Sequence, residues 1–265
     1  MPRLVAIIAF AALSASALFS KSATAQDATR RPRPEDTEVW RPVPPVVRVP
    51  ATAAQTPPPS DAIILFDGSS LDAWVNARDS QPAGWTVADG LMTVNKRAGD
   101  IRTKQSFRDF QIHLEWRVPT HITGEGQARG NSGLFLATAG SGYELQILDS
   151  YQNETYVNGM AGSMYKQAIP LANPTRPPGE WQVYDVIWRA PRFDAAGALV
   201  DSARVTVFFN GVLVQDNFAM RGETRFIGAP TSRPYERSPI LLQSHGDPSP
   251  PISFRNIWLR ELPSP

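Results

Sequence analysis

Hydrophobic and polar residues alternate strictly over 110–118, which is the pattern of a β-strand with one buried face. The apolar positions are Phe110, Ile112, Leu114, Trp116 and Val118. The polar positions between them include His113 and Glu115, which could form either a solvent face or an ion-pair row. The segment is therefore predicted to be a half-buried antiparallel strand.

Shorter runs of the same kind recur after residue 60, separated by turn-forming residues. Asn210-Gly211 and Asp89-Gly90 predict tight hairpins, because both residues of such turns must tolerate positive φ. No apolar stretch repeats at helical spacing for three turns. The pattern predicts an all-β fold, a two-sheet antiparallel jelly-roll sandwich. The expected strands are 62–66, 85–87, 91–94, 110–118, 133–137, 143–148, 183–188, 204–209, 212–214, 240–243 and 254–262.

The start of the chain has a different character. Arg3 precedes an uncharged run over 4–20, and Ala23-Thr24-Ala25 has the small residues of a cleavage site. This layout predicts a signal peptide over 1–25, export to the periplasm or the medium, and no membrane contact after cleavage. An uncleaved anchor is the weaker alternative, because the uncharged run is shorter than the about 20 residues that a membrane span needs.

Proline dominates the next segment. Residues 27–60 hold nine of the 25 prolines and almost no periodic apolar pattern. Such a stretch favours extended geometry and buries too little surface to fold, so 26–60 is predicted to be a disordered linker. A docking peptide for a partner is the alternative, with Trp40 and Val46-Val47 as its adhesive side chains.

Charge and cysteine content narrow the function classes. The 265 residues carry a formal charge of +1, but 61–265 holds 19 basic and 21 acidic residues, so the positive excess lies before this domain. Nucleic acid is therefore not an expected partner. The chain has no cysteine, so an exported form could not use disulfides and would depend on a sizeable core.

Several short phrases with a distinctive order span nearly all of 63–262. The phrases are Leu65-Phe66-Asp67-Gly68 with Trp74, Trp85-Thr86-Val87-Ala88-Asp89-Gly90, Phe107-Arg108-Asp109-Phe110, Gly130-Asn131-Ser132-Gly133-Leu134-Phe135, Tyr143-Glu144-Leu145-Gln146-Ile147-Leu148-Asp149, Gly162-Ser163-Met164-Tyr165, Gly179-Glu180-Trp181-Gln182, Leu242-Gln243-Ser244-His245-Gly246 and Phe254-Arg255-Asn256-Ile257. In content and order they resemble the 3-keto-disaccharide hydrolase family, formerly domain of unknown function 1080.

The resemblance implies a concanavalin A-like jelly roll over 61–265. It also implies action on glycosides whose sugar ring is oxidised at its third carbon. Two positions depart from the family pattern. Asp67 stands where many relatives have Asn, and the loop over 247–251 is longer, which would reshape the surroundings of the implied site.

Two residues are candidates for proton transfer. Glu144 and Gln146 should share one face of their strand, so a carboxyl group would lie beside an amide. Asp149 falls out of phase, so a retaining mechanism with two carboxylates about 5 Å apart has little support. His245 ends a strand beside Gly246, and an imidazole can transfer protons near neutral pH. A purely structural role is the alternative for each.

Sugar binding would use amide, cationic and aromatic side chains, and a position in an ordinary surface loop is the alternative for each one. The predicted binding residues are Gln146, Asn131, Arg102, Tyr165 and Lys166. No cofactor is predicted, because the usual nucleotide and zinc motifs are missing. A divalent metal stays an open alternative, since carboxylates, amides and His245 could converge.

These observations together predict an enzyme that cleaves 3-keto-glycosides by elimination and hydration. Glu144 and His245 would act as acid and base in an unassigned order. The expected partner is a carbohydrate. Two alternatives remain: a noncatalytic carbohydrate-binding module that uses the same sheet, and a family 16-like glycosidase that acts on unoxidised glucan.

Overall fold

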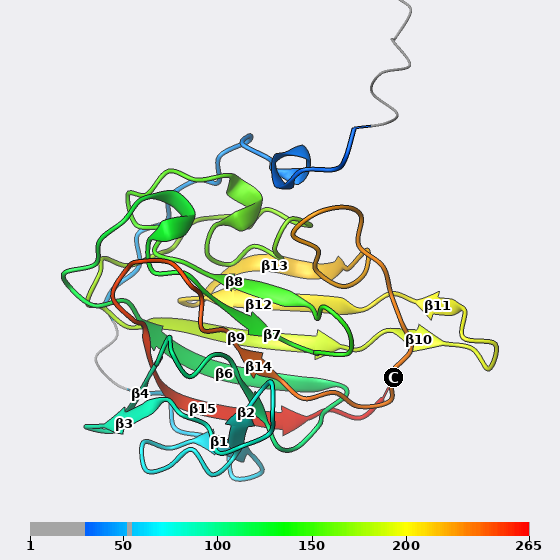
Figure 1. Ribbon diagram of the computed structural model, residues 1–265, viewed down its shortest axis with the longest axis horizontal. Coiled ribbons are helices and arrows are strands. Elements are labelled where there is room, and N and C mark those ends of the chain that lie inside the picture. The colour runs from blue at the N-terminus through cyan, green and yellow to red at the C-terminus, as the bar shows by residue number, and fades with distance from the viewer. Residues whose placement is uncertain (1–29, 52–54, 265) are drawn as a thin grey trace, which may run out of the picture. The chain divides into compact units, whose positions relative to one another are not determined.

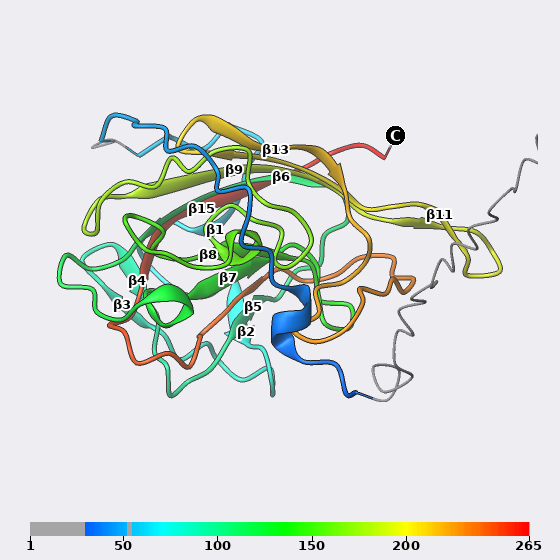
Figure 2. The same ribbon diagram turned by 90° about the horizontal axis from the view of Figure 1, so that it is seen from above.

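Two antiparallel β-sheets lie face to face and form the all-β jelly-roll sandwich that the sequence predicts (Figures 1 and 2). The larger sheet has the order β13 (Val212–Ala219), β12 (Arg204–Phe209), β9 (Gln182–Arg189), β6 (Phe110–Arg117), β15 (Ser253–Glu261), β4 (Leu91–Thr93) and β3 (Thr86–Ala88), with β1 (Ile63–Phe66) paired to β15. The smaller sheet has the order β2 (Trp74–Asn76), β5 (Ile101–Thr103), β14 (Leu241–Leu242), β7 (Ser132–Phe135) and β8 (Glu144–Ile147). A separate short pair consists of β10 (Arg192–Phe193) and β11 (Leu199–Asp201).

This computed structural model describes residues 30–51 and 55–264. The signal peptide predicted over 1–25 lies outside these residues, so cleavage and export stay predictions. The chain splits into the units Met1–Pro32 and Arg33–Pro265, and the strands named above belong to the second. Within the described residues, no helix has the length and apolar character that a membrane span requires.

The alternating strand is confirmed as β6, and its apolar residues form the centre of the core. Phe110, Ile112, Leu114 and Trp116 are fully buried. On the opposite sheet, Leu145 and Ile147 of β8 are also fully buried in this core. Because side chains alternate along a strand, Glu144 and Gln146 point away from the core.

Both predicted hairpins are observed. Asn210 and Gly211 have φ angles of 52° and 81° between β12 and β13, and Asp89 and Gly90 have 52° and 74° between β3 and β4. The strands β2, β5, β10 and β11 were not predicted. Each contains only two or three residues, which is too short for an alternating pattern to be recognised.

Helical structure in the described residues is limited to short 3-10 turns. These are η2 (Pro34–Thr37), η3 (Gly126–Ala128) and η4 (Val157–Gly159). All three belong to segments outside the two sheets, so they do not change the fold class. One of them, η3, carries Gln127 of the site described below, and η4 directly follows Tyr156 of that site.

The N-terminal tail, residues 33–51, packs on the sandwich and corrects the prediction of a disordered linker for this part of 26–60. The N–H of Val47 donates to the carbonyl oxygen of Asn173 at 3.0 Å, and the N–H of Asn173 donates to the carbonyl oxygen of Pro45 at 2.8 Å. Arg176 Nε donates to the carbonyl oxygen of Pro50 at 2.8 Å. A proline-rich segment can be held in this way because proline keeps its carbonyl acceptor, although it lacks an N–H.

The polar face of β6 is buried at its centre, which the prediction of a half-buried strand did not anticipate, while Gln111 and Arg117 are partly exposed. His113 and Glu115 are both 0% exposed. His113 Nδ1 lies 2.7 Å from Asp185 Oδ1, and Arg255 Nε donates to Glu115 Oε2 at 2.6 Å. Of the two alternatives for this face, the structure therefore shows the ion-pair row.

Candidate active site

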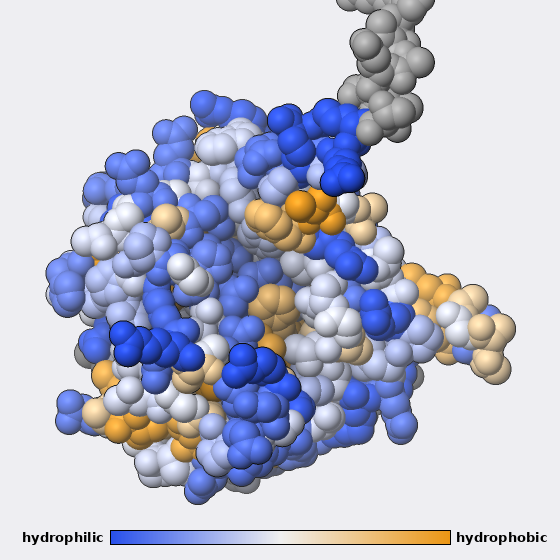
Figure 3. Space-filling model, in the orientation of Figure 1, coloured by the Kyte–Doolittle hydropathy of each residue, from blue (hydrophilic) through white to orange (hydrophobic). Residues whose placement is uncertain are grey.

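A cavity of about 560 Å³ opens on the face of the smaller sheet that points away from the core. Phe135 of β7 pairs with Glu144 of β8, and Gly133 pairs with Gln146, so these four positions share that face. Figure 3 shows the same face hollowed near its centre, with mostly hydrophilic residues around the hollow. The cavity is lined by Gln127, Asn131, Phe135, Ser141, Glu144, Gln146, Tyr156, Tyr165, Thr224, Phe226, Gln243 and His245.

Glu144 supplies the carboxyl group of the cavity. It is only 6% exposed, and within the described residues neither of its carboxyl oxygens accepts a hydrogen bond. Burial, with a smaller contribution from the charge of Asp100, raises the pKa of Glu144 to about 8. A carboxyl group with this pKa is mostly protonated at neutral pH and is able to donate a proton.

Three amide side chains form a connected row along the cavity. Gln146 Nε2 donates to Asn131 Oδ1 at 3.0 Å, and Asn131 Nδ2 donates to the carbonyl oxygen of Gln127 at 2.8 Å. Gln127 Nε2 in turn donates to the carbonyl oxygen of Gly159 at 2.8 Å. Because a carbonyl can only accept, these bonds set the orientation of each amide and leave the buried Gln146 Oε1 without a partner among the described residues.

Two tyrosines meet in the wall of the cavity. The hydroxyl oxygens of Tyr156 and Tyr165 lie 2.6 Å apart, so one hydroxyl donates to the other. Burial raises the pKa of both, to about 12 for Tyr165. Both therefore remain protonated at neutral pH, and the accepting hydroxyl keeps its own proton for a further hydrogen bond.

His245 comes from the segment after β14 and is held by Asp247. His245 Nδ1 lies 3.2 Å from Asp247 Oδ2, and also 3.2 Å from the N–H of Asp247. Within the described residues, His245 Nε2 has no hydrogen-bond partner. The imidazole is therefore fixed through one nitrogen while the other is available for proton transfer.

Asp247 is itself anchored. Its burial raises the pKa, but hydrogen bonds from His245 and Ser249 and the charge of Lys96 outweigh burial and lower the pKa to about 2. Lys96 Nζ lies 3.3 Å from Asp247 Oδ2 and donates to the carbonyl oxygen of Ser249 at 2.8 Å. The extended loop over 247–251 thus places a permanently charged carboxylate behind His245.

The structure brings five of the seven predicted site residues into this cavity. These are Glu144, His245, Gln146, Asn131 and Tyr165. Arg102 lies on β5, which β14 and β7 separate from β8, and it donates to Ser80 Oγ at 2.9 Å. Lys166 donates to the carbonyl oxygens of Pro34 at 2.6 Å and Phe226 at 3.1 Å instead of facing the cavity.

Sequence reasoning missed several residues of the site. Gln127 and Tyr156 lie in segments that carry no alternating pattern, so nothing local marks them. Asp247 had a detectable signal, because Asp247-Pro248-Ser249 is a turn-forming sequence, and the N–H of Ser249 does donate to Asp247 Oδ1 at 2.9 Å.

A second carboxylate is missing from the lining of this cavity among the described residues. Asp149 is 1% exposed and pairs with Arg129, whose Nε lies 2.8 Å from Asp149 Oδ2. No cluster of three or more metal-ligating His, Cys, Asp or Glu residues occurs in the described part of the chain. The groups positioned for chemistry are therefore one carboxyl group, one imidazole, a row of amides and a tyrosine pair.

A family model described as a 3-keto-alpha-glucoside-1,2-lyase-like domain matches residues 61–260. No curated protein matches the chain.

Three solved structures, all of presumed glycosyl hydrolases from Parabacteroides distasonis ATCC 8503, are similar to this chain. One is 55% identical with a TM-score of 0.75. The match covers 86% of this chain and 96% of the chain of that structure. Because 86% of 265 residues is about 228, this likeness extends beyond the domain over 61–265 into the segment before it. The other two share the fold. They are 19% and 22% identical with TM-scores of 0.55 and 0.51, and they cover 77% and 76% of this chain and 94% and 99% of their own.

Proposed function

The chain belongs to the family of 3-keto-alpha-glucoside-1,2-lyase-like domains, as its motifs had indicated. We propose that it cleaves the glycosidic bond of glucosides oxidised at the third ring carbon. Family membership supports a glycoside-cleaving enzyme, and the oxidised substrate is the finer step of the proposal. The observation that carries it is the pairing of one protonatable carboxyl group, Glu144, with one imidazole, His245, in a single cavity.

The first step removes a proton. A ketone at the third carbon makes the hydrogen on the second carbon acidic, so a base of moderate strength can take it. His245 fits this role in the tautomer in which Nδ1–H donates to Asp247 Oδ2, because Nε2 then carries no proton and has no partner in the described residues. The electron pair of the broken C–H bond moves to the ketone oxygen and forms an enolate.

The enolate requires a hydrogen-bond donor at its oxygen. The Tyr156–Tyr165 pair has one hydroxyl proton that is not used within the pair. The hydroxyl that carries this proton is a suitable donor. A neutral donor suits the role because no charged group has to lose its hydration when the sugar binds. The amide row from Gln127 to Gln146 would bind and orient the sugar hydroxyls.

The second step breaks the glycosidic bond. The enolate reforms the ketone, a double bond forms between the first and second carbons, and the glycosidic oxygen leaves from the first carbon. Glu144 donates its proton to that oxygen, which its pKa of about 8 allows at neutral pH. Elimination thus needs one acid and one base, which are the two groups that the cavity contains.

Water then adds to the first carbon of the unsaturated ketone. Glu144, now a carboxylate, accepts the proton of the attacking water, and the protonated His245 returns a proton to the second carbon. Both side chains regain their starting states, and the net reaction is hydrolysis. Release of the unsaturated ketone before water adds would make the same site a lyase.

An ordinary retaining glycosidase requires two carboxyl groups about 5 Å apart. Among the described residues, Glu144 is the one carboxylate that lines the cavity. This composition favours elimination over direct displacement.

The experiment is to incubate the purified chain with 3-keto-trehalose and, in parallel, with trehalose. The reactions are run in D₂O, and the products are analysed by mass spectrometry and NMR. We expect cleavage of the oxidised sugar alone, with deuterium at the second carbon of the released 3-keto-glucose. Samples without enzyme, and 3-keto-glucose incubated with the enzyme, correct for spontaneous elimination and exchange.

Cleavage without deuterium at the second carbon would contradict elimination and support direct displacement. Saturable binding without product, by a folded protein, would instead favour the noncatalytic carbohydrate-binding module. Cleavage of unoxidised glucan would favour the ordinary glycosidase.

A further inference from the structure

A buried ammonium group lies against three aromatic residues of the cavity wall. Lys166 is 5% exposed, and its Nζ lies 4.7 Å from the ring centroid of Phe226, 5.5 Å from that of Tyr156 and 5.8 Å from that of Tyr165. A cation at this distance from an aromatic ring is attracted to it. Lys166 therefore contacts the lining of the cavity from outside.

The N-terminal tail provides the hydrogen-bond acceptor that this ammonium needs. Lys166 Nζ donates to the carbonyl oxygen of Pro34 at 2.6 Å and to that of Phe226 at 3.1 Å. Burial lowers the pKa of Lys166, and the tail residues Glu38 and Glu35 oppose that shift. Because a buried charge is costly without partners, removing the tail would leave Lys166 poorly satisfied.

The tail also contacts the ring of Tyr156 and the turn that follows it. Trp40 packs edge-on against the Tyr156 ring, with centroids 6.2 Å apart and planes at 74°. The N–H of Val157 donates to the carbonyl oxygen of Val39 at 2.7 Å, and Asn158 Nδ2 donates to that of Thr37 at 2.9 Å. The turn η4, which follows Tyr156, is thus bonded directly to the tail.

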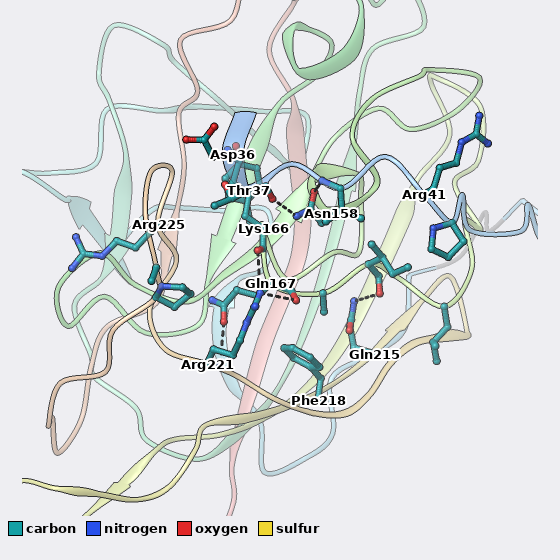
Figure 4. Close-up of a pocket in the computed structure, with 18 of the residues that line it drawn as sticks. Asp36, Thr37, Arg41, Asn158, Lys166, Gln167, Gln215, Phe218, Arg221 and Arg225 are labelled. Atoms are coloured by element: carbon teal, nitrogen blue, oxygen red, sulfur yellow. Dashed lines mark hydrogen bonds between the residues drawn. The ribbon is translucent and has the colours of Figure 1, made fainter. Parts of the chain in front are cut away.

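Figure 4 shows Lys166 beside this part of the tail, close to Thr37 and Asn158. The drawn residues line a second cavity of about 880 Å³, to which the tail contributes Asp36, Thr37, Val39, Arg41 and Pro42. Tyr165 lines both this cavity and the candidate active site. The cavity that the tail lines and the candidate active site therefore meet at Tyr165.

We propose that residues 34–40 support the substrate site. They hold its aromatic wall, which consists of Tyr156, Tyr165 and Phe226, in place through Lys166 and Trp40. Both are positioning residues, because they act on the substrate through Tyr156, Tyr165 and Phe226. The likeness to the 55% identical solved structure also extends into the segment before residue 61. The role of this wall in sugar binding rests on the proposed function, whereas its dependence on the tail does not.

The test of that dependence uses no substrate. Hydrogen–deuterium exchange is measured on the full chain and on the variants Trp40→Ala and Lys166→Met. The control is Val46→Ala, which shortens a tail side chain that is 72% exposed. We expect exchange in peptides covering 155–167 to rise at least fivefold in the first two variants and to stay unchanged in the control.

Unchanged exchange over 155–167 in Trp40→Ala would overturn the proposal. Because Trp40 is half exposed, this variant keeps the core intact and decides the test even if Lys166→Met fails to fold. The result does not depend on whether the enzyme cleaves 3-keto-glucosides.

Kinetics then test the positioning role. On a 3-keto-glucoside, Trp40→Ala should lower kcat/KM about 5- to 20-fold, with a fall in kcat, because the wall carries the tyrosine hydroxyl that stabilises the enolate. Trp40→Phe should restore most of kcat/KM because it restores the aromatic contact. An equal kcat/KM in wild type and Trp40→Ala would contradict a role of the tail in the substrate site.

Discussion

The carboxyl group of Glu144 occupies the space that a side chain at Gly133 would fill. A β-carbon added at Gly133 would stand 2.7 Å from Glu144 Oε1 and 3.2 Å from Glu144 Cγ. Gly133 lies in β7 and has no positive φ angle, so space rather than backbone conformation requires glycine at this position.

Replacing Gly133 with Ala should displace the carboxyl group of Glu144 and lower kcat about 10- to 100-fold. Gly246→Ala is the matched control, because a β-carbon there would meet no atom within 4 Å and the φ angle of Gly246 is not positive. Steady-state rates on a 3-keto-glucoside and melting temperatures would be measured for both variants. Equal rates in wild type and Gly133→Ala would show that the position of Glu144 is unimportant for the reaction.

Glu144→Gln should abolish most activity and stabilise the protein at alkaline pH. Loss of the acid should reduce kcat by about 10²- to 10⁴-fold. The pKa of Glu144 rises on folding from 4.5 to about 8, so its contribution to stability is complete below pH 4.5 and is lost as the pH rises through 8. Glutamine cannot ionise, so the variant should exceed the wild type in free energy of unfolding by roughly 1–3 kcal/mol above pH 8.

Urea unfolding at pH 5, 7 and 9 measures this difference, with the exposed Glu236→Gln as a control. A difference that is the same at all three pH values would mean that Glu144 is not buried as a neutral acid.

Asp247→Asn should lower kcat about tenfold and change KM less than threefold. The substitution removes the carboxylate that accepts from His245 Nδ1–H at 3.2 Å. The backbone N–H at position 247 can then donate to Nδ1, which places the imidazole proton on Nε2 and prevents that nitrogen from acting as a base. Lys96→Met, which removes the cation 3.3 Å from Asp247 Oδ2, should have a smaller effect because the carboxylate remains. Wild-type kcat in Asp247→Asn would argue against His245 as the base.

The ion-pair row on β6 should make the protein less stable at alkaline pH. Burial lowers the pKa of His113, but hydrogen bonds to Asp185 and Glu115 outweigh it and raise the pKa from 6.5 to about 9. The stability contributed by protonated His113 is therefore complete below pH 6.5 and is lost as the pH rises through 9. We expect a decrease of roughly 1–3 kcal/mol across this range.

This decrease is best measured in the Glu144→Gln background, where Glu144 cannot titrate. The further substitution His113→Asn should lower stability at pH 6 and remove most of the pH dependence between 6.5 and 9. A pH dependence that survives in the double variant would assign it to another group.

Sequence reasoning succeeded where the pattern is local. Three local features are present in the structure as predicted, and each depends only on neighbouring residues. They are the alternation over 110–118, the Asn210-Gly211 turn, and the position of Glu144 and Gln146 on the same face of one strand. It failed for β2 and β5, whose three residues each are too few to display a period. It also failed for Lys166, since sequence does not show which way a loop cation turns.

The amino-acid sequence was thus enough to predict an all-β sandwich, its family and two candidate groups for proton transfer. These depend on side-chain alternation and on motifs, which are properties of short stretches of chain. The tertiary structure alone decided that Gln127 and Tyr156 join Glu144, that Asp247 holds His245, and that the tail supports the cavity wall. The tail is bound mainly through its own backbone carbonyls, and because every residue has such a carbonyl, no side-chain pattern could have revealed where it docks.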